Sequence, residues 1–182
     1  MRSEFPGILP DADGQGHESQ SAGARGLKKL DVNYSTNRSG LELAISIKTM
    51  NFTDGTSKRF TKNTKRVDGE LRAEAQDCHS RQPYAVLAGF FFVPWASADD
   101  GTRSSLKHNV NVFAQRGGRT DKTSDHSLFE FMFIGLYRDD GYVRFFPATH
   151  DAPERGVPDT LMTFSETLSQ IKKLHGERNR RR

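Results

Sequence analysis

The sequence predicts an α/β fold in which a mixed β-sheet is flanked by helices. A continuous apolar run over residues 84–93 ends at Pro94 and is typical of a strand that is buried on both faces. Apolar residues recur at helical spacing over residues 104–116 and again after residue 163, which predicts helices that cover the sheet. At 182 residues the chain has the length of one ordinary domain.

The ends of the chain differ in composition from its middle. Residues 1–26 are rich in Gly, Ser and Asp and contain no apolar run, so we expect a disordered tail there. Residues 27–176 are expected to form the single domain. Residues 177–182 carry four arginines and are expected to be a basic tail.

Residues 30–48 predict a β-hairpin. Apolar and polar residues alternate over 41–48, so that Leu41, Leu43, Ile45 and Ile47 are expected on one face of a strand. The preceding residues 35–40 are turn-prone. If the turn is centred on residues 37–39, Asp31 lies across from Ser46, and Lys48 lies on the same polar face.

A helix is expected after this hairpin, from Asp68 to about His79. Its buried stripe is predicted to contain Leu71, Ala75 and Cys78. Glu74 borders that stripe and Glu70 lies one step further out, whereas the opposite side, with His79, is expected to face solvent.

The second half of the chain completes the α/β order. A helix over 104–116 is followed by strands over 128–137 and 142–146, which flank an Asp-Gly turn. Thr163 and Glu166 form a capping box that begins the last helix.

Composition narrows the range of functions. The formal net charge of +4 and the isoelectric point near 9.3 permit a nucleic acid partner without requiring one. Cys78 is the single cysteine, which excludes an intrachain disulfide and a multi-cysteine zinc site. Without a signal-like or membrane-spanning segment, we expect a cytoplasmic protein that does not enter a membrane.

Three acids and a lysine form the candidate catalytic set: Asp31, Lys48, Glu74 and Glu70. Carboxylate oxygens suit a hard divalent cation, so Asp31 with Glu74 or Glu70 is the predicted Mg²⁺ site, with Mn²⁺ as a substitute. Between the hairpin and the helix, five cations are spaced by Thr, Asn and Phe, a pattern that favours phosphate contacts; they are Lys58, Arg59, Lys62, Lys65 and Arg66.

These residues resemble the PD-(D/E)xK nuclease superfamily, which has the restriction-endonuclease-like fold. Leu30-Asp31 resembles its first acid, and Ser46-Ile47-Lys48 resembles its acid-x-Lys triplet with Ser in place of the acid. Some restriction enzymes of this superfamily share the Ser-x-Lys form and take the missing acid from the following helix, where Glu70 and Glu74 stand. The block 70–87 also resembles an uncharacterised bacterial restriction-endonuclease-like family.

The resemblance implies a Mg²⁺-dependent DNA endonuclease that hydrolyses phosphodiester bonds, in which Lys48 orients or activates the attacking water. A homodimer is a further implication, since restriction-like folds often work as dimers. The superfamily core, however, begins with a helix and a strand before the Asp-bearing strand, and residues 1–26 are expected to supply neither. A truncated product is therefore one interpretation of the chain.

Four other interpretations remain open. The chain could be a non-catalytic nucleic-acid-binding or accessory subunit, derived from such a nuclease by N-terminal truncation. It could also be a protein-interaction module that pairs through an exposed sheet edge. Asp31 and Lys48 could form an ordinary surface ion pair, and Glu70 and Glu74 could simply be acids that the helix macrodipole favours near its N-terminus.

Overall fold

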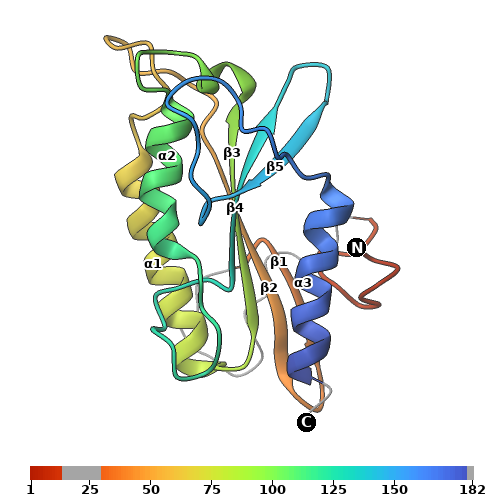
Figure 1. The fold of residues 1–182 in the computed structure, drawn as a ribbon. Coiled ribbons are helices and arrows are strands. Elements are labelled where there is room, and N and C mark those ends of the chain that lie inside the picture. Colours follow the sequence, from red (N-terminus) through yellow and green to blue (C-terminus); the bar gives the residue numbers. More distant parts are fainter. Residues whose placement is uncertain (14–29, 180–182) are drawn as a thin grey trace.

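A five-stranded mixed sheet forms the centre of the protein. It is seen in a computed structural model that describes residues 1–13 and 30–179 (Figure 1). The strand order is β1-β2-β3-β4-β5, with β1 antiparallel to β2, β2, β3 and β4 parallel to one another, and β5 antiparallel to β4. The strands are β1 (Val32–Thr36), β2 (Gly40–Thr49), β3 (Val86–Pro94), β4 (Phe131–Tyr137) and β5 (Val143–Pro147). The predicted α/β class with a helix-flanked mixed sheet is confirmed.

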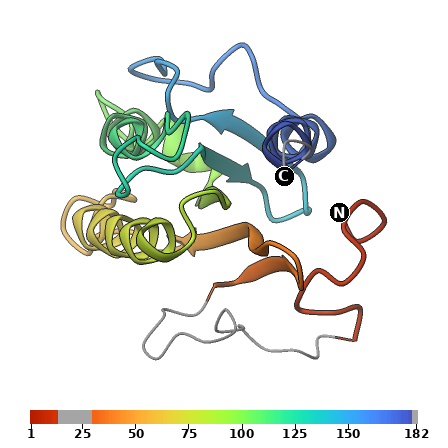
Figure 2. The same cartoon turned by 90° about the horizontal axis from the view of Figure 1, so that it is seen from below.

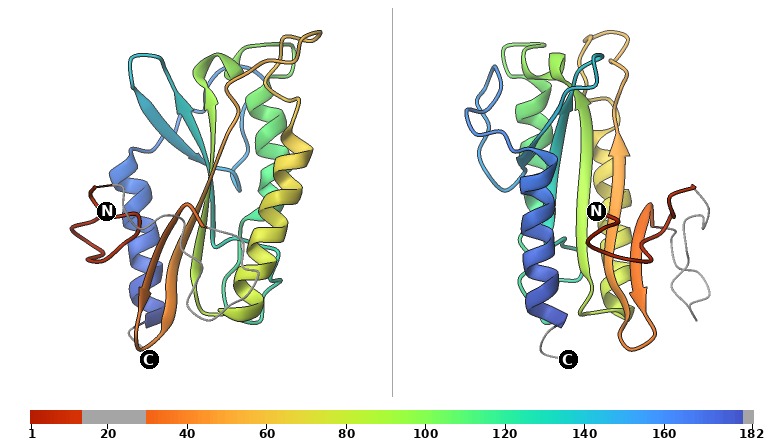
Figure 3. Two further views of the ribbon diagram at one scale, coloured as in Figure 1. Left: turned by 180° about the vertical axis from the view of Figure 1, so that it is seen from behind. Right: turned by 90° about the vertical axis from the view of Figure 1, so that its right-hand side faces the viewer.

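Helices cover both faces of this sheet (Figures 1 and 2). On one face lie α1 (Thr64–Arg81) and α2 (Ser105–Phe113), with the short 3-10 helices η1 (Trp95–Ala98) and η2 (Ala114–Arg116). On the other face lie α3 (Phe164–Asn179) and the N-terminal segment, residues 1–13 (Figure 3). An apolar layer lies on each face of the sheet. Alternate side chains of β2 and β3 contribute to the two layers, because successive residues of a strand point to opposite faces.

The three parallel strands end at the same edge of the sheet. The segment after β2, helix η1 after β3, and the β4–β5 hairpin all emerge there, at the top of Figure 1. Side chains near the carboxyl ends of β2, β3 and β4 therefore share one end of the molecule, where loops can place chemistry on a rigid scaffold.

The N-terminal segment corrects one expectation. Phe5 and Ile8 are buried against the apolar layer beneath α3, and Leu9 exchanges two backbone hydrogen bonds with Asn33 at the outer edge of β1 (2.9 and 3.0 Å). The burial of these two side chains and the backbone pairing with β1 hold the segment, although its apolar residues form no periodic pattern. The disordered tail expected for residues 1–26 is therefore wrong for residues 1–13, and its remainder, 14–26, lies outside the described residues.

The C-terminal helix also differs from its prediction. It starts at the predicted capping box, where Thr163 and Glu166 bond each other's backbone N–H groups. However, α3 runs to Asn179, and Arg178 is anchored to the sheet through Glu130 (2.6 Å). Residues 177–179 of the predicted basic tail are thus helical, and residues 180–182 lie outside the described part.

Candidate functional site

The hairpin has the predicted register where the candidate site begins. Val32 pairs with Ile45 and Asn33 with Ala44, which places Asp31 across from Ser46. The Asp31 side chain turns toward the strand, where its Oδ2 accepts the backbone N–H of Ile47 at 2.6 Å. Asp31 therefore closes the open end of the β1–β2 ladder, which satisfies a backbone donor that β1 does not reach.

Helix α1 delivers Glu74 to the same hairpin. The Ser46 hydroxyl donates to Glu74 Oε2 at 2.5 Å, and the Lys48 ammonium donates to Glu74 Oε1 at 2.7 Å. Ser46 is 1% exposed and Glu74 is 7% exposed, so their hydrogen bond is shielded from water. Both Glu74 oxygens are thus engaged by residues of β2, and the three side chains form one connected cluster.

Glu70 lies at the rim of this cluster. Its Oε2 is 4.0 Å from Lys48 Nζ, while its Oε1 accepts from Arg66 at 3.0 Å. The Glu70 side chain is 35% exposed, compared with 8% for Glu74. One turn of helix therefore separates a buried carboxylate from a solvated one, and both approach the same ammonium group.

The amphipathic pattern of α1 explains why Glu74 reaches the hairpin. Leu71, Ala75 and Cys78 are buried against the sheet, as the sequence predicts, and Glu74 borders them. Burial raises the pKa of the Cys78 thiol to about 12, so it is an inert packing group. His79 was expected on the solvated side but is fully buried, because the C-terminal end of the helix brings it within 3.5 Å of Glu130, the buried residue that precedes β4.

The structure does not bring Asp31 into one carboxylate cluster with Glu70 and Glu74. Among residues 1–13 and 30–179, no group of three or more His, Cys, Asp or Glu side chains is close enough together to hold a metal ion. Lys48 instead makes its ion pairs with the two acids of α1. The assembled cluster is therefore Ser46, Lys48 and Glu74, with Glu70 at its rim and Asp31 across the hairpin.

The predicted face of the second strand is wrong at its start. The pairing of β1 and β2 shifts between Tyr34 and Ser35, and as a result Leu41 packs beneath α1 while Leu43 packs beneath α3. Glu42 lies on the α3 side, where its Oε2 is 2.9 Å from His175 Nε2. This irregularity leaves the register at Ser46 and Lys48 unchanged.

The basic segment, residues 58–66, is anchored rather than loose. The backbone N–H of Phe60 donates to Asp100 Oδ2 (3.2 Å), and Asn109 of α2 donates to the Phe60 carbonyl (3.2 Å). Arg59 is partly buried and lies 4.0 Å from Asp100. The remaining cations of the segment are exposed: Lys58, Lys62, Lys65 and Arg66.

The first turn of α1 holds two of these exposed cations. Lys65 and Arg66 lie within α1, because the helix begins at Thr64, four residues before the predicted cap at Asp68. Partial burial, together with the positive charges of Arg59, Arg103 and Lys65, lowers the pKa of His108 on α2. Positive potential therefore extends from the basic segment onto the adjoining end of α2.

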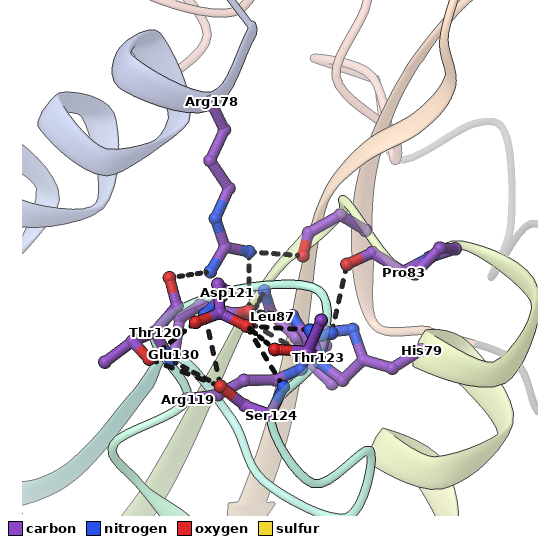
Figure 4. Close-up of polar contacts among 11 residues, drawn as sticks. His79, Pro83, Leu87, Arg119, Thr120, Asp121, Thr123, Ser124, Glu130 and Arg178 are labelled. Carbon is purple, nitrogen blue, oxygen red and sulfur yellow. Dashed lines mark hydrogen bonds and ion pairs between the residues drawn. The ribbon is translucent and has the colours of Figure 1, made fainter.

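A second polar cluster, missed by the sequence analysis, lies at the opposite end of the sheet (Figure 4). Glu130 accepts from Arg119 (2.7 Å), from Arg178 (2.6 Å) and from the Leu87 backbone N–H (2.7 Å), and His79 lies 3.5 Å away. Burial alone would raise the pKa of Glu130, but the neighbouring His79, Arg178 and Leu87 N–H lower it. No local pattern signals this cluster, because its members lie on separate elements that only the assembled fold brings together.

No protein-family model matches the chain, and comparison with curated proteins and with solved structures finds no significant match. In the described part of the chain, no helix has the length and apolar character that a membrane crossing requires.

Proposed function

We propose that this protein is a metal-dependent DNA endonuclease of the restriction type, which hydrolyses phosphodiester bonds. One observation carries the proposal. Glu74 of α1 lies against Ser46 and Lys48, where the resemblance to Ser-x-Lys nucleases expects an acid supplied by the following helix. A carboxylate in that position restores the acid-and-lysine pair that the strand alone does not have.

The residues present fit a Mg²⁺ ion by their donor chemistry. Mg²⁺ is usually held by one or two carboxylates together with waters and substrate phosphates. Asp31 and Glu74 are the acids that would hold it, and Glu70, which is more exposed, is the alternative to Glu74, although these carboxylates do not form one cluster in the described part of the chain. When bound, the ion would neutralise charge that develops on the phosphate and lower the pKa of an attacking water.

The protein's own residues would orient the reaction. Ser46 donates to Glu74 and fixes its carboxylate plane, while the ion pair with Glu74 holds the Lys48 ammonium at the end of β2. The Lys48 side chain is 22% exposed, so its remaining donors can reach a water or a phosphate oxygen. Lys48 would then hold the attacking water in line and stabilise the charge of the reacting phosphate.

The exposed cations of the basic segment would bind the DNA backbone. Lys58, Lys62 and Lys65 extend from a segment that is anchored to α2, so little ordering is needed on binding. Replacing these three lysines by Gln should weaken DNA retention and reduce the slope of log affinity against log salt by about 3.

The test is cleavage of supercoiled plasmid by the full chain in Mg²⁺ or Mn²⁺. Lys48→Ala is compared with Lys173→Ala, which removes an exposed lysine from α3 on the opposite face of the sheet. We expect metal-dependent nicking by the wild-type protein and by Lys173→Ala, with a loss of at least about 100-fold in Lys48→Ala. EDTA should abolish cutting in every sample.

Two further variants separate the acids of α1. Glu74→Gln should abolish cutting and Glu70→Gln should retain it, if Glu74 is the ligand; the reverse result assigns the role to Glu70. Equal cutting by wild type and Lys48→Ala would refute the proposed chemistry. Salt-sensitive DNA retention without cutting would instead support a non-catalytic binding or accessory subunit.

A further inference from the structure

The tip of the β4–β5 hairpin carries an ordered stack of aromatic and guanidinium groups. The Arg138 guanidinium lies 4.3 Å from the ring centre of Trp95 and 4.8 Å from that of Tyr142, and Arg144 lies 4.2 Å from the Tyr142 ring centre. Trp95 and Tyr142 also meet edge to face at 5.7 Å. The stack fixes the hairpin against helix η1 and positions the Arg138 guanidinium. Because no hydrogen bond or ion pair from this side chain to another described residue is present, its N–H groups can donate to a ligand.

We propose that this hairpin tip reads base edges in the major groove of duplex DNA and so sets the sequence preference of the nuclease. The inference rests on the proposed function, because it assigns to the β4–β5 hairpin the contact with the bases of the DNA that the proposed nuclease would cut. The major groove of B-DNA admits a two-stranded β-ribbon, which is the form of this element.

The charges of the hairpin favour base edges over phosphates. Its exposed tip combines Arg138 with the carboxylates of Asp139 and Asp140, and no ion pair within the described residues neutralises Arg138. Asp140 Oδ1 accepts the Tyr142 backbone N–H at 2.9 Å, whereas Asp139 makes no hydrogen bond to any described residue. Two carboxylates repel a phosphate backbone, but a donor beside an acceptor suits guanine and cytosine edges.

The stack also favours duplex DNA over an unpaired strand. Proteins that hold single strands stack bases on open aromatic faces. Here guanidinium groups lie over the rings of Trp95 and Tyr142. The aromatic rings therefore serve to orient Arg138 and Arg144 rather than to receive a base.

The hairpin lies at the same end of the sheet as Lys48. Arg138 and Lys48 also lie on the same face, so both can contact one DNA duplex. Lys48 is in register with Phe91 of β3, and Phe91 with Ile134 of β4; Trp95 packs on the same apolar layer as Phe91. Arg138 is two strands from Lys48 and four residues further along, which gives a separation of roughly 16 Å from standard strand dimensions. At about 3.4 Å per base pair, the contacted bases lie about five base pairs from the reacting phosphate.

The experiment selects DNA from a random-sequence duplex pool with the full chain in EDTA, so that the readout does not depend on cutting. Wild type is compared with Arg138→Lys, Asp139→Asn and Lys173→Ala, and thermal melting checks that each variant is folded. Arg138→Lys keeps the charge but loses the two-pronged guanidinium contact, so a phosphate contact would tolerate it and a base contact would not.

We expect wild type and Lys173→Ala to enrich one motif. Arg138→Lys should lose at least 10-fold of the preference at one base pair, and Asp139→Asn should change the preferred base at another. Where the wild type cuts, both positions should lie about five base pairs from the cut.

Three outcomes would overturn the inference and separate it from the nuclease proposal. Cutting without an enriched motif, or a motif that Arg138→Lys and Asp139→Asn leave unchanged, removes the hairpin from base reading and leaves the nuclease intact. Enrichment without cutting keeps the hairpin and refutes the nuclease. Absence of DNA binding refutes both.

Discussion

The contact between Glu74 and β2 should measurably stabilise the fold. Glu74→Ala removes the acceptor of the buried Ser46 hydroxyl and of the Lys48 ammonium, whose side chain is 22% exposed. A hydrogen bond to a charged group contributes about 1.5–3 kcal/mol, and partial solvation of Lys48 reduces the second contact. We therefore expect Glu74→Ala to lower the free energy of unfolding by about 2–4 kcal/mol, or roughly 5–15 °C in melting temperature for a chain of this size.

Urea unfolding followed by the fluorescence of Trp95, the single tryptophan, measures this change. The double-mutant cycle with Lys48→Met isolates the pair, and we expect a coupling energy of at least about 0.5 kcal/mol. The apolar pair Lys48→Met with Glu74→Leu should recover most of the stability, because replacing a buried ion pair by packed apolar groups is often neutral. A Glu74→Ala protein within about 0.5 kcal/mol of wild type, with zero coupling, would refute the contact.

Three further predictions concern the rest of the fold. The lowered pKa of Glu130 stabilises the native state above the ordinary glutamate pKa, and this stabilisation is lost as pH falls through the lowered value; Glu130→Gln should therefore flatten the acid limb of the stability curve, and an unchanged limb would contradict it. Arg178→Ala should release the end of α3 and speed amide exchange over its last turn, with Lys173→Ala as the unaffected control. Phe5→Ala should lower the free energy of unfolding by about 3 kcal/mol, whereas a dispensable N-terminal segment would give no change in urea unfolding.

Local periodicity was sufficient to predict two of the contacts around the candidate site. Alternation along β2 and the turn-prone residues before it set the register that places Asp31 across from Ser46. The helical wheel of α1 set Glu74 at the border of the buried stripe, on the side that meets Lys48. Both are short-range patterns, because a strand or helix repeats its faces every few residues.

Features that depend on contacts between distant segments were not predictable in this way. The burial of Phe5 requires α3 to lie over the same face of the sheet. The burial of His79 requires Glu130, the residue that precedes β4, to be in place. The shift at Tyr34 likewise has no signal in the alternation of β2. In each case, the partner is chosen by the assembled fold rather than by neighbouring residues.

The polar cluster on β2 is a poor solution for stability alone. Ser46 and Glu74 lie beside the apolar core beneath α1, and two charges removed from water regain little more than their desolvation cost. Glu42 and His175 form a second polar pair in the same sheet, on the face away from the basic segment. There Phe5 packs against the His175 ring. Lys48 instead keeps part of its surface open, at the end of the sheet where the exposed cations of residues 58–66 begin. A polar cluster that adds little more stability than packed apolar groups would, and that opens toward a cationic surface, favours chemistry on an anionic substrate over a purely structural role.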